Sequence, residues 1–169
     1  MHTIVSPFLL PAEVLAVREV SKQVRGWISG RRNTGYEKLE LNEGHIERYN
    51  FQSFLERARS LLPSGAGVVA AADAYLLWYP NGAYVSPHID DDDTSTAISR
   101  LNVLITKPKL GGILIIEGRE VLLEEGEGVI FRPDVQQHSV TPVVGERLVL
   151  TFGVAVRKRK EKQWGTERG

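Results

Sequence analysis

The chain has 169 residues, 42% hydrophobic and 25% charged, which is ordinary for one globular domain and leaves enough apolar residues for a core. Its 21 basic and 21 acidic residues give a formal net charge of zero, so no overall attraction to nucleic acid or to a membrane is expected. The absence of cysteine excludes disulfides, a thiol nucleophile and a thiolate-bound metal, and no stretch approaches the roughly 20 apolar residues of a membrane span. We therefore predict a cytoplasmic protein with a single domain over residues 1–169 and leave its oligomeric state open.

Residues 1–67 are expected to be mainly helical. An apolar stripe at helical spacing follows Pro11, and a second stripe runs from Ile46 to Leu62. Between them "GYEKLEL" alternates in the manner of a strand. We expect the two helices to brace one outer face of a sheet.

From residue 68 to residue 157 the sequence predicts one short strand after another. About eight segments rich in Val, Ile and Leu are separated by Gly, Pro, Asp or Asn. So many short strands in so few residues are typical of a sandwich or a closed jelly roll. The prediction is a mainly β fold with N-terminal helices and a double-stranded β-helix (jelly roll) core at residues 68–157, followed by a frayed basic tail at residues 158–169.

The most informative short motif is His88-Ile89-Asp90. Side chains two residues apart on a strand lie on the same face, so His88 and Asp90 can point into one cavity. A divalent iron bound by nitrogen and oxygen ligands favours two imidazoles and one carboxylate on one face, which leaves three positions open. The chain has three other histidines, and His138 is the one that opens a strand, 50 residues after His88. We predict that His88, Asp90 and His138 form a metal site.

Arg147 stands nine residues after His138 in an apolar strand. Alternation places Arg147, Val149 and Thr151 on one face of that strand. An arginine that faces the interior needs an anion, and a dicarboxylate co-substrate would supply one through a bidentate contact.

With these residues in place, the segment from about residue 72 to residue 156 resembles the 2-oxoglutarate/Fe(II)-dependent dioxygenases, in particular their prolyl-hydroxylase-like branch. The resemblance rests on an ordered set of short motifs: Tyr79, the turn Pro80-Asn81-Gly82, His88-Ile89-Asp90, Gly111-Gly112, and "HSVTPVVGER" with His138 and Arg147.

The resemblance implies an enzyme that uses Fe(II), 2-oxoglutarate and O2 to hydroxylate an unactivated C–H bond, with release of succinate and CO2. The expected substrate is an amino-acid-like small molecule or a peptide side chain. His88, Asp90 and His138 would hold the iron, and Arg147 would bind the distal carboxylate of 2-oxoglutarate with the help of the Tyr79 hydroxyl. Because Asp90 supplies a carboxylate ligand, hydroxylation is favoured over halogenation.

Several neighbouring residues have more than one interpretation. Asn102 and Thr151 are further cofactor-binding candidates by strand parity, although packing explains Asn102 equally well, and Arg100 and Leu104 share that parity. Tyr75 or Tyr84 could supply the hydroxyl in place of Tyr79. The pair Arg31-Arg32 is expected to be solvated.

The three aspartates that follow the metal motif, Asp91, Asp92 and Asp93, are expected to form a solvated loop. The alternative is that they receive a basic group of the substrate.

Two other functions stay open at this point. One is a non-catalytic, cupin-like jelly roll that binds a metal or a ligand, although the His-x-His motif typical of cupins is absent. The other is a nucleic-acid demethylase of the same superfamily, in which a second arginine follows a Thr-Phe-like segment. Here Gly153 follows Phe152, and nucleic acid is an unlikely partner of a chain without net charge.

Overall fold

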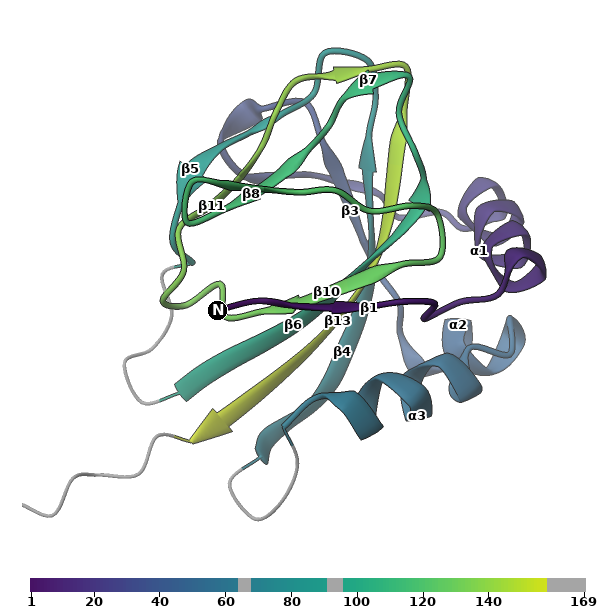
Figure 1. The fold of residues 1–169 in the computed structure, drawn as a ribbon. Coiled ribbons are helices and arrows are strands. Elements are labelled where there is room, and N and C mark those ends of the chain that lie inside the picture. The colour runs from purple at the N-terminus through teal and green to yellow at the C-terminus, as the bar shows by residue number, and fades with distance from the viewer. Residues whose placement is uncertain (64–67, 91–95, 158–169) are drawn as a thin grey trace, which may run out of the picture.

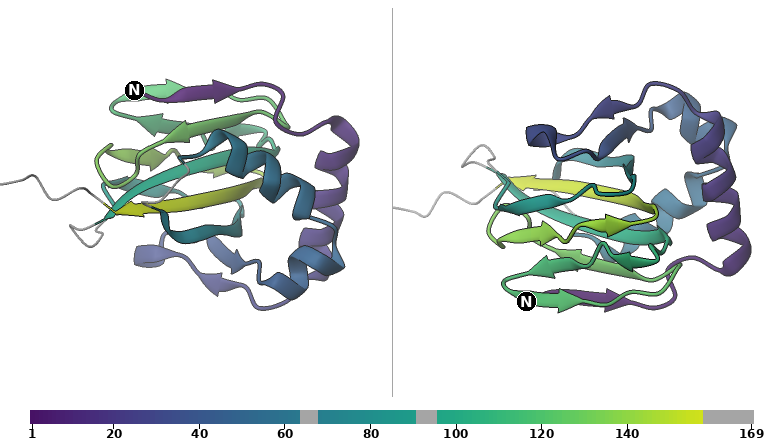
Figure 2. Two further views of the ribbon diagram at one scale, coloured as in Figure 1. Left: turned by 90° about the horizontal axis from the view of Figure 1, so that it is seen from below. Right: turned by 90° about the horizontal axis from the view of Figure 1, so that it is seen from above.

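The protein is described by a computed structural model that covers residues 1–63, 68–90 and 96–157, without the side chains of residues 68–72. Two antiparallel sheets face each other, and the helices cover the outer side of the larger sheet (Figures 1 and 2). This is the predicted jelly roll with N-terminal helices. No helix in the described ranges is long and apolar enough to cross a membrane.

The larger sheet has seven strands and contains the two longest described pairings, those of its central strand β13 with β4 and β6. Its order is β1 (Thr3–Val5), β10 (Gly128–Phe131), β6 (Thr96–Thr106), β13 (Arg147–Arg157), β4 (Val68–Tyr79), β3 (Glu37–Glu40) and β2 (Ile28–Ser29). The first 67 residues therefore supply strands to both edges of this sheet in addition to helices.

The smaller sheet closes the other side of the jelly roll. Its order is β5 (Val85–His88), β11 (His138–Val140), β8 (Leu114–Ile116) and β9 (Arg119–Val121). A short ribbon of β7 (Leu110–Gly111) and β12 (Val143–Val144) joins the two sheets at one end.

The helices are α1 (Pro11–Gln23), α2 (Glu43–Arg48) and α3 (Gln52–Leu61), and a short 3-10 turn spans Arg31–Asn33. The continuous helix expected from Ile46 to Leu62 is wrong. Asn50 has a φ of 56°, in the left-handed region that asparagine tolerates better than most residues, and this conformation ends one helix before the next begins. The apolar periodicity runs across the break, so the pattern did not reveal it.

Alternation along β13 divides its side chains between two apolar cores. Leu148, Leu150 and Phe152 face the helices and are at most 4% exposed, and Phe8 packs on Phe152 with ring centroids 5.8 Å apart. Val149 faces the smaller sheet and packs in the core between the sheets. Arg147 and Thr151 share this inner face, where they line or support a cavity between the two sheets.

Candidate metal centre and co-substrate site

His88 and His138 lie opposite each other in the smaller sheet. His88 ends β5, His138 begins β11, and the two residues are direct partners in the register of this strand pair. Their ring centroids are 4.2 Å apart. The sheet thus brings together two imidazoles that are 50 residues apart in the sequence.

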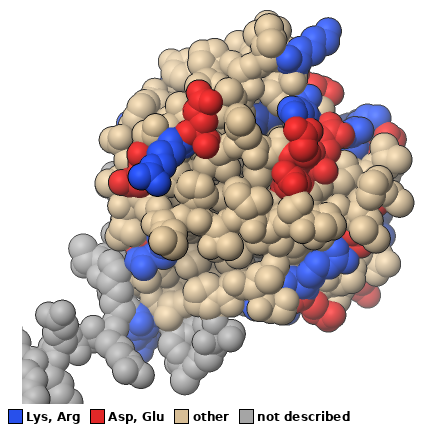
Figure 3. Space-filling view, viewed as in Figure 1, with Lys and Arg blue, Asp and Glu red and all other residues tan. Residues whose placement is uncertain are grey.

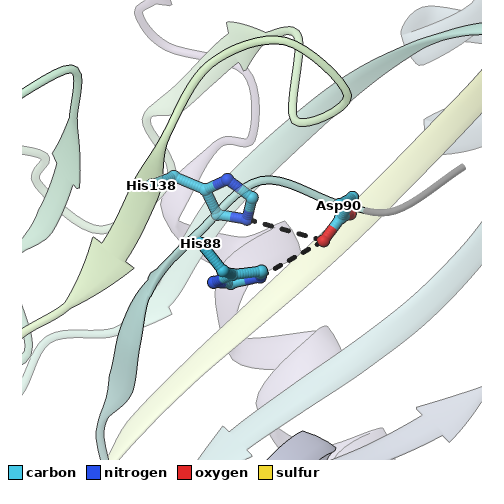
Figure 4. Close-up of side chains that lie close together, drawn as sticks. All are labelled: His88, Asp90 and His138. Carbon is cyan, nitrogen blue, oxygen red and sulfur yellow. Dashed lines mark ion pairs between the residues drawn. The ribbon is translucent and has the colours of Figure 1, made fainter.

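Asp90 completes the group (Figure 4). Its Oδ1 lies 3.2 Å from His88 Nε2 and 3.9 Å from His138 Nε2, and the candidate ligand atoms of the three residues all lie within 4.8 Å of one another. The side chain of Asp90 is 4% exposed. Its backbone N–H donates to the carbonyl of Pro133, at 2.8 Å, which ties it to the loop that precedes His138.

Each imidazole is oriented by a backbone carbonyl two residues before it. His88 Nδ1 lies 2.9 Å from the oxygen of Ser86, and His138 Nδ1 lies 3.1 Å from the oxygen of Gln136. A carbonyl can only accept, so these contacts favour the tautomer with the hydrogen on Nδ1, which leaves Nε2 of each ring free to bind a metal. Burial lowers the pKa of His138 and so favours the neutral form that binds a metal. Two such nitrogens and one carboxylate fit a divalent iron.

The loop before His138 is held by Arg132 and Asp134. Two hydrogen bonds join their side chains, from Nε to Oδ1 at 2.9 Å and from Nη2 to Oδ2 at 2.6 Å. Burial alone would raise the pKa of Asp134, but the hydrogen bonds and charge of Arg132 outweigh it and lower the pKa. The Gln136 side chain also accepts from the Arg132 backbone, at 2.7 Å. This loop therefore positions both Asp90 and His138.

Two arginines meet the carboxylate of Asp90. Arg31 Nη1 lies 3.3 Å from Oδ1, and Arg100 Nη1 lies 2.8 Å from Oδ2. The contact with Oδ2 is an ion pair outside hydrogen-bond geometry, since that oxygen has no hydrogen-bond partner among the described residues. With Oδ1 turned to the imidazoles and Oδ2 to Arg100, Asp90 is set to bind a metal through one oxygen.

A cavity of about 230 Å³ extends from the three candidate ligands to Arg147 and Tyr79. Arg147 is 4% exposed, and no carboxylate in the described part of the chain pairs with it. Burial lowers its pKa, although a guanidinium stays charged at any physiological pH. A buried cation without an acidic partner among the described residues, in the same cavity as a candidate metal site, is suited to bind one carboxylate of a dicarboxylate ligand.

Tyr79 lies against this arginine. The Arg147 guanidinium carbon is 4.9 Å from the centroid of the Tyr79 ring, and the two residues are partners in the register of β13 and β4. Burial, partly offset by the charge of Arg147, raises the pKa of Tyr79 to about 12, so its hydroxyl stays protonated and can donate to a carboxylate. Tyr36 stacks on the same ring, with centroids 5.2 Å apart.

Comparison with solved structures shows the same fold at low sequence identity. The chain matches a prolyl-4-hydroxylase from Pseudomonas putida with a TM-score of 0.72 and 22% identity, over 93% of this chain and 92% of the other. A prolyl hydroxylase from Trichoplax adhaerens, in complex with a hypoxia inducible factor peptide fragment, gives a TM-score of 0.68 at 17% identity, over 92% and 83% of the two chains. HygX from Streptomyces hygroscopicus, with nickel, 2-oxoglutarate and hygromycin B bound, gives 0.67 at 10% identity, over 92% and 82%.

The chain has the fold of the prolyl hydroxylases and other 2-oxoglutarate-Fe(II) oxygenases. This agrees with the resemblance that the sequence motifs indicated. No family model matches the sequence, and neither does any curated protein.

Of the remaining residues that the sequence singled out, some line the cavity and others do not. Asn102 lines the cavity, whereas Thr151 is fully buried and donates its hydroxyl hydrogen to Asn102 Oδ1, at 3.0 Å. Thr151 therefore orients Asn102 and does not itself line the cavity. Tyr75 lines the cavity, and Tyr84 is 42% exposed and does not. Asp91, Asp92 and Asp93 lie outside the described residues.

The paired glycines of the motif have a steric explanation. Gly112 has a φ of +60°, and a Cβ there would lie 3.1 Å from Arg147 Cδ and 2.8 Å from the ring of Pro108. A larger residue would therefore press on the arginine that faces the cavity.

The cavity includes polar residues that the sequence did not single out and one that it misplaced. Lys38 and Tyr36 line it from β3 and the turn before it, and Arg31, which we expected to be solvated, lies at its mouth beside Asp90. The alternation in "GYEKLEL" could have placed Lys38 on an inner face, but only the pairing of β3 with β4 puts that face in the cavity.

Proposed function

We propose that the protein is a 2-oxoglutarate- and Fe(II)-dependent oxygenase that hydroxylates an unactivated C–H bond of an amino-acid-like small molecule or a peptide side chain, with release of succinate and CO2. The observation that carries this proposal is the joint content of one cavity. It has two imidazole nitrogens and a carboxylate at one end and, at the other, a buried arginine that no described carboxylate neutralises.

The roles of the residues follow from this geometry. His88, Asp90 and His138 would hold Fe(II), which supplies the redox chemistry that joins 2-oxoglutarate, O2 and substrate. Arg147 would bind the distal carboxylate of 2-oxoglutarate, and Tyr79 would donate a hydrogen bond to it. Asn102, held by Thr151, would add a polar contact along the cavity wall. The apolar side chains of Leu77, Val85 and Leu114 would limit the access of water to the reacting centre.

The substrate class is inferred from proteins of the same fold. One similar structure is a prolyl hydroxylase in complex with a peptide fragment, and another holds hygromycin B, so this fold accepts both peptides and small molecules. We expect one of these two kinds of substrate, and we expect the protein to act in the cytoplasm.

Anaerobic addition of Fe(II) and then 2-oxoglutarate tests the site directly. We expect a weak visible charge-transfer absorption band when 2-oxoglutarate chelates the bound metal, and succinate when air and substrate are admitted. The band should be absent in His88→Ala and retained in the control His2→Ala, which changes a histidine outside the cavity. A protein that binds Fe(II) but forms no band and no succinate would instead be a cupin-like binding protein.

A substrate panel scored by succinate release would then identify the substrate. Small amino-acid derivatives, peptides and methylated oligonucleotides belong in one panel. Turnover of the oligonucleotides alone would replace the proposed substrate class with that of a nucleic-acid demethylase.

A further inference from the structure

The cavity contains more positive charge than the proposed co-substrate requires. Besides Arg147, three cationic side chains line it, namely Arg31, Lys38 and Arg100. Asp90 is the only acidic side chain among the described lining residues. A divalent metal and the 2-oxoglutarate dianion would cancel each other, and Arg100 pairs with Asp90. Among the described lining residues, three positive charges would then remain, those of Arg31, Lys38 and Arg147.

These cations lie at two depths. Arg147 is 4% exposed and lies beside Tyr79, whereas the Arg31 side chain is 60% exposed and lies at the mouth beside Asp90. Because Arg147 is buried, it is suited to bind a co-substrate that becomes enclosed. Because Arg31 is exposed, it is suited to bind a molecule that enters the cavity after the co-substrate.

Tyr75 lies close to two of these cations. Lys38 Nζ lies 4.4 Å from the centroid of its ring, and Arg100 Cζ lies 5.7 Å from the same centroid. In the order of the larger sheet, β3 with Lys38 and β6 with Arg100 lie on opposite sides of β4, which carries Tyr75. Burial raises the pKa of Tyr75, so its hydroxyl is a neutral donor at physiological pH. The cavity wall here presents two cations flanking an aromatic ring.

Among the described residues, the ion pairs of Arg31, Lys38 and Arg100 are either screened by solvent or made with Asp90, a candidate metal ligand. Lys38 Nζ lies 3.1 Å from Glu40 Oε1, but the Glu40 side chain is 74% exposed and does not line the cavity, so solvent screens the pair. Arg31 and Arg100 share the single carboxylate of Asp90, which a bound metal would also use. The positive charge is local, because the whole chain has no net charge and the face in Figure 3 mixes both signs.

We propose that the substrate has an anionic group, a carboxylate or a phosphate, which Arg31 and Lys38 bind at the cavity mouth next to the ring of Tyr75. This inference rests on the proposed function, because it assumes that the metal and 2-oxoglutarate fill the deeper part. Arg100 keeps its place on Asp90, and the substrate anion occupies the space between Arg31 and Lys38. The reacting carbon then lies between this anion and the metal.

The sequence offers the opposite expectation at the same place. Asp91, Asp92 and Asp93 follow Asp90 directly and would favour a basic group if they faced the substrate. The sign of the substrate charge therefore separates the two interpretations, and a series of related probes of different charge can measure it.

The experiment uses the full chain loaded with Zn(II), which does not turn over, and titration calorimetry in place of an activity assay. Binding of 2-oxoglutarate is measured first, and its failure would overturn the proposed function itself. With 2-oxoglutarate bound, the probes are N-acetyl-L-proline, its neutral amide N-acetyl-L-prolinamide, and cationic L-prolinamide. Phenyl phosphate and benzoate distinguish a phosphate from a carboxylate site.

We expect the acids to bind about tenfold or more tightly than the neutral amide, since hydrogen bonds to charged groups are the stronger ones. Arg31→Gln and Lys38→Gln should each lower the affinity for the acids by about fivefold to tenfold and leave that for the amide unchanged. The matched control Arg119→Gln removes an exposed arginine outside the cavity and should change neither.

Three results would overturn the inference while leaving the proposed function intact. The first is that the acid and the neutral amide bind equally, or that neither binds at millimolar concentration. The second is that L-prolinamide binds more tightly than the acid, and the third is that acids bind only after Asp91, Asp92 and Asp93 are changed to Asn. The last result would mean that the cations at the mouth serve those aspartates and not a substrate.

Discussion

The two faces of the seven-stranded sheet use the same strands for different purposes. The outer face carries Leu76, Leu150 and Phe152 into a continuous apolar core beneath the helices. On the inner face, alternate residues of the same strands include Tyr75, Tyr79, Arg147 and Thr151, all buried and all polar or amphipathic. Neighbouring positions of β13 thus face the apolar core and the candidate site in turn.

This difference teaches that burial alone does not identify a structural residue in this fold. Leu150 and Thr151 are both 0% exposed, and they lie next to each other in the chain. The apolar one contributes by removing surface from water, whereas the polar one is stable inside because its hydroxyl reaches Asn102. Substitutions on the outer face should therefore change the free energy of unfolding, and those on the inner face should change ligand binding.

The largest expected effect on the inner face is that of His88→Ala. Loss of an outer partner of a metal ligand commonly costs 10–100-fold in affinity, so loss of a ligand itself should weaken Fe(II) binding by more than about 100-fold. The urea midpoint of the metal-free protein should move little. Iron content after desalting and a urea titration measure the two properties, and retained stoichiometric iron would remove His88 from the ligand set.

On the outer face, Leu150→Ala should give the largest loss of stability. The side chain is fully buried between β13 and the helices, and a Leu→Ala change in a core costs about 2–5 kcal/mol. Urea unfolding of the metal-free protein measures this. If 2-oxoglutarate affinity of the still folded variant falls as well, the two faces are not independent.

Arg147→Ala should have the reverse pattern. A charge-assisted hydrogen bond contributes about 1.5–3 kcal/mol, so 2-oxoglutarate should bind about 10–100-fold more weakly. Stability without ligand should stay the same or rise, because the substitution removes a buried charge that no described carboxylate neutralises. Calorimetry on the Zn(II)-loaded protein measures the first effect. An unchanged affinity would place the co-substrate elsewhere.

Thr151→Val tests whether one inner residue acts through another. The change keeps the shape of the side chain and removes the donor to Asn102 Oδ1, which should cost about 1 kcal/mol of stability and weaken 2-oxoglutarate binding a few-fold at most. The companion variant Asn102→Ala should have the larger effect on binding. If Thr151→Val has the larger one, Thr151 contacts the ligand itself.

The smallest expected effect concerns the rim of the helical layer, where Glu13 of α1 pairs with Arg57 of α3 at 2.8 Å. Hydrogen bonding to Arg57 is the main cause that lowers the pKa of Glu13 below its ordinary value of 4.5. The unfolded chain therefore binds this proton at a higher pH, and the stabilising effect is lost as the pH falls from about 4.5 through the lower folded pKa. Glu13→Gln should remove that part of the acid sensitivity, as urea midpoints between neutral pH and about pH 3 would show. The inner-face metal affinity at neutral pH should not change.

Much of the jelly roll could be predicted because its strands carry local signals. The segments "VVAAADAYLLWY" and "ERLVLTFGVAV" coincide with β4 and β13, and strand parity correctly separated Leu150 from Arg147 and Thr151. The helix break at Asn50 escaped because one backbone conformation decides it, while the apolar spacing continues on both sides.

The site was predictable to the extent that residue type restricts the choice. With four histidines in the chain and an aspartate two residues from only one of them, few combinations were possible, and the fold brings the chosen three together. Arg31 and Lys38 were not found, because their place depends on the pairing of β3 with β4 over some 40 residues of chain. No spacing within a single strand contains that information.

Because His88 and His138 are direct partners in the register of β5 and β11, the candidate metal site can form only when these two strands pair correctly. The two residues meet only when β5 and β11 pair without a slip, and a shift by one residue would turn one imidazole to the opposite face of the smaller sheet. We expect such a long-range contact to form late, because the chain between its ends must be ordered first. Metal affinity should therefore appear in the last phase of refolding, when a chain that is already compact acquires its correct strand register.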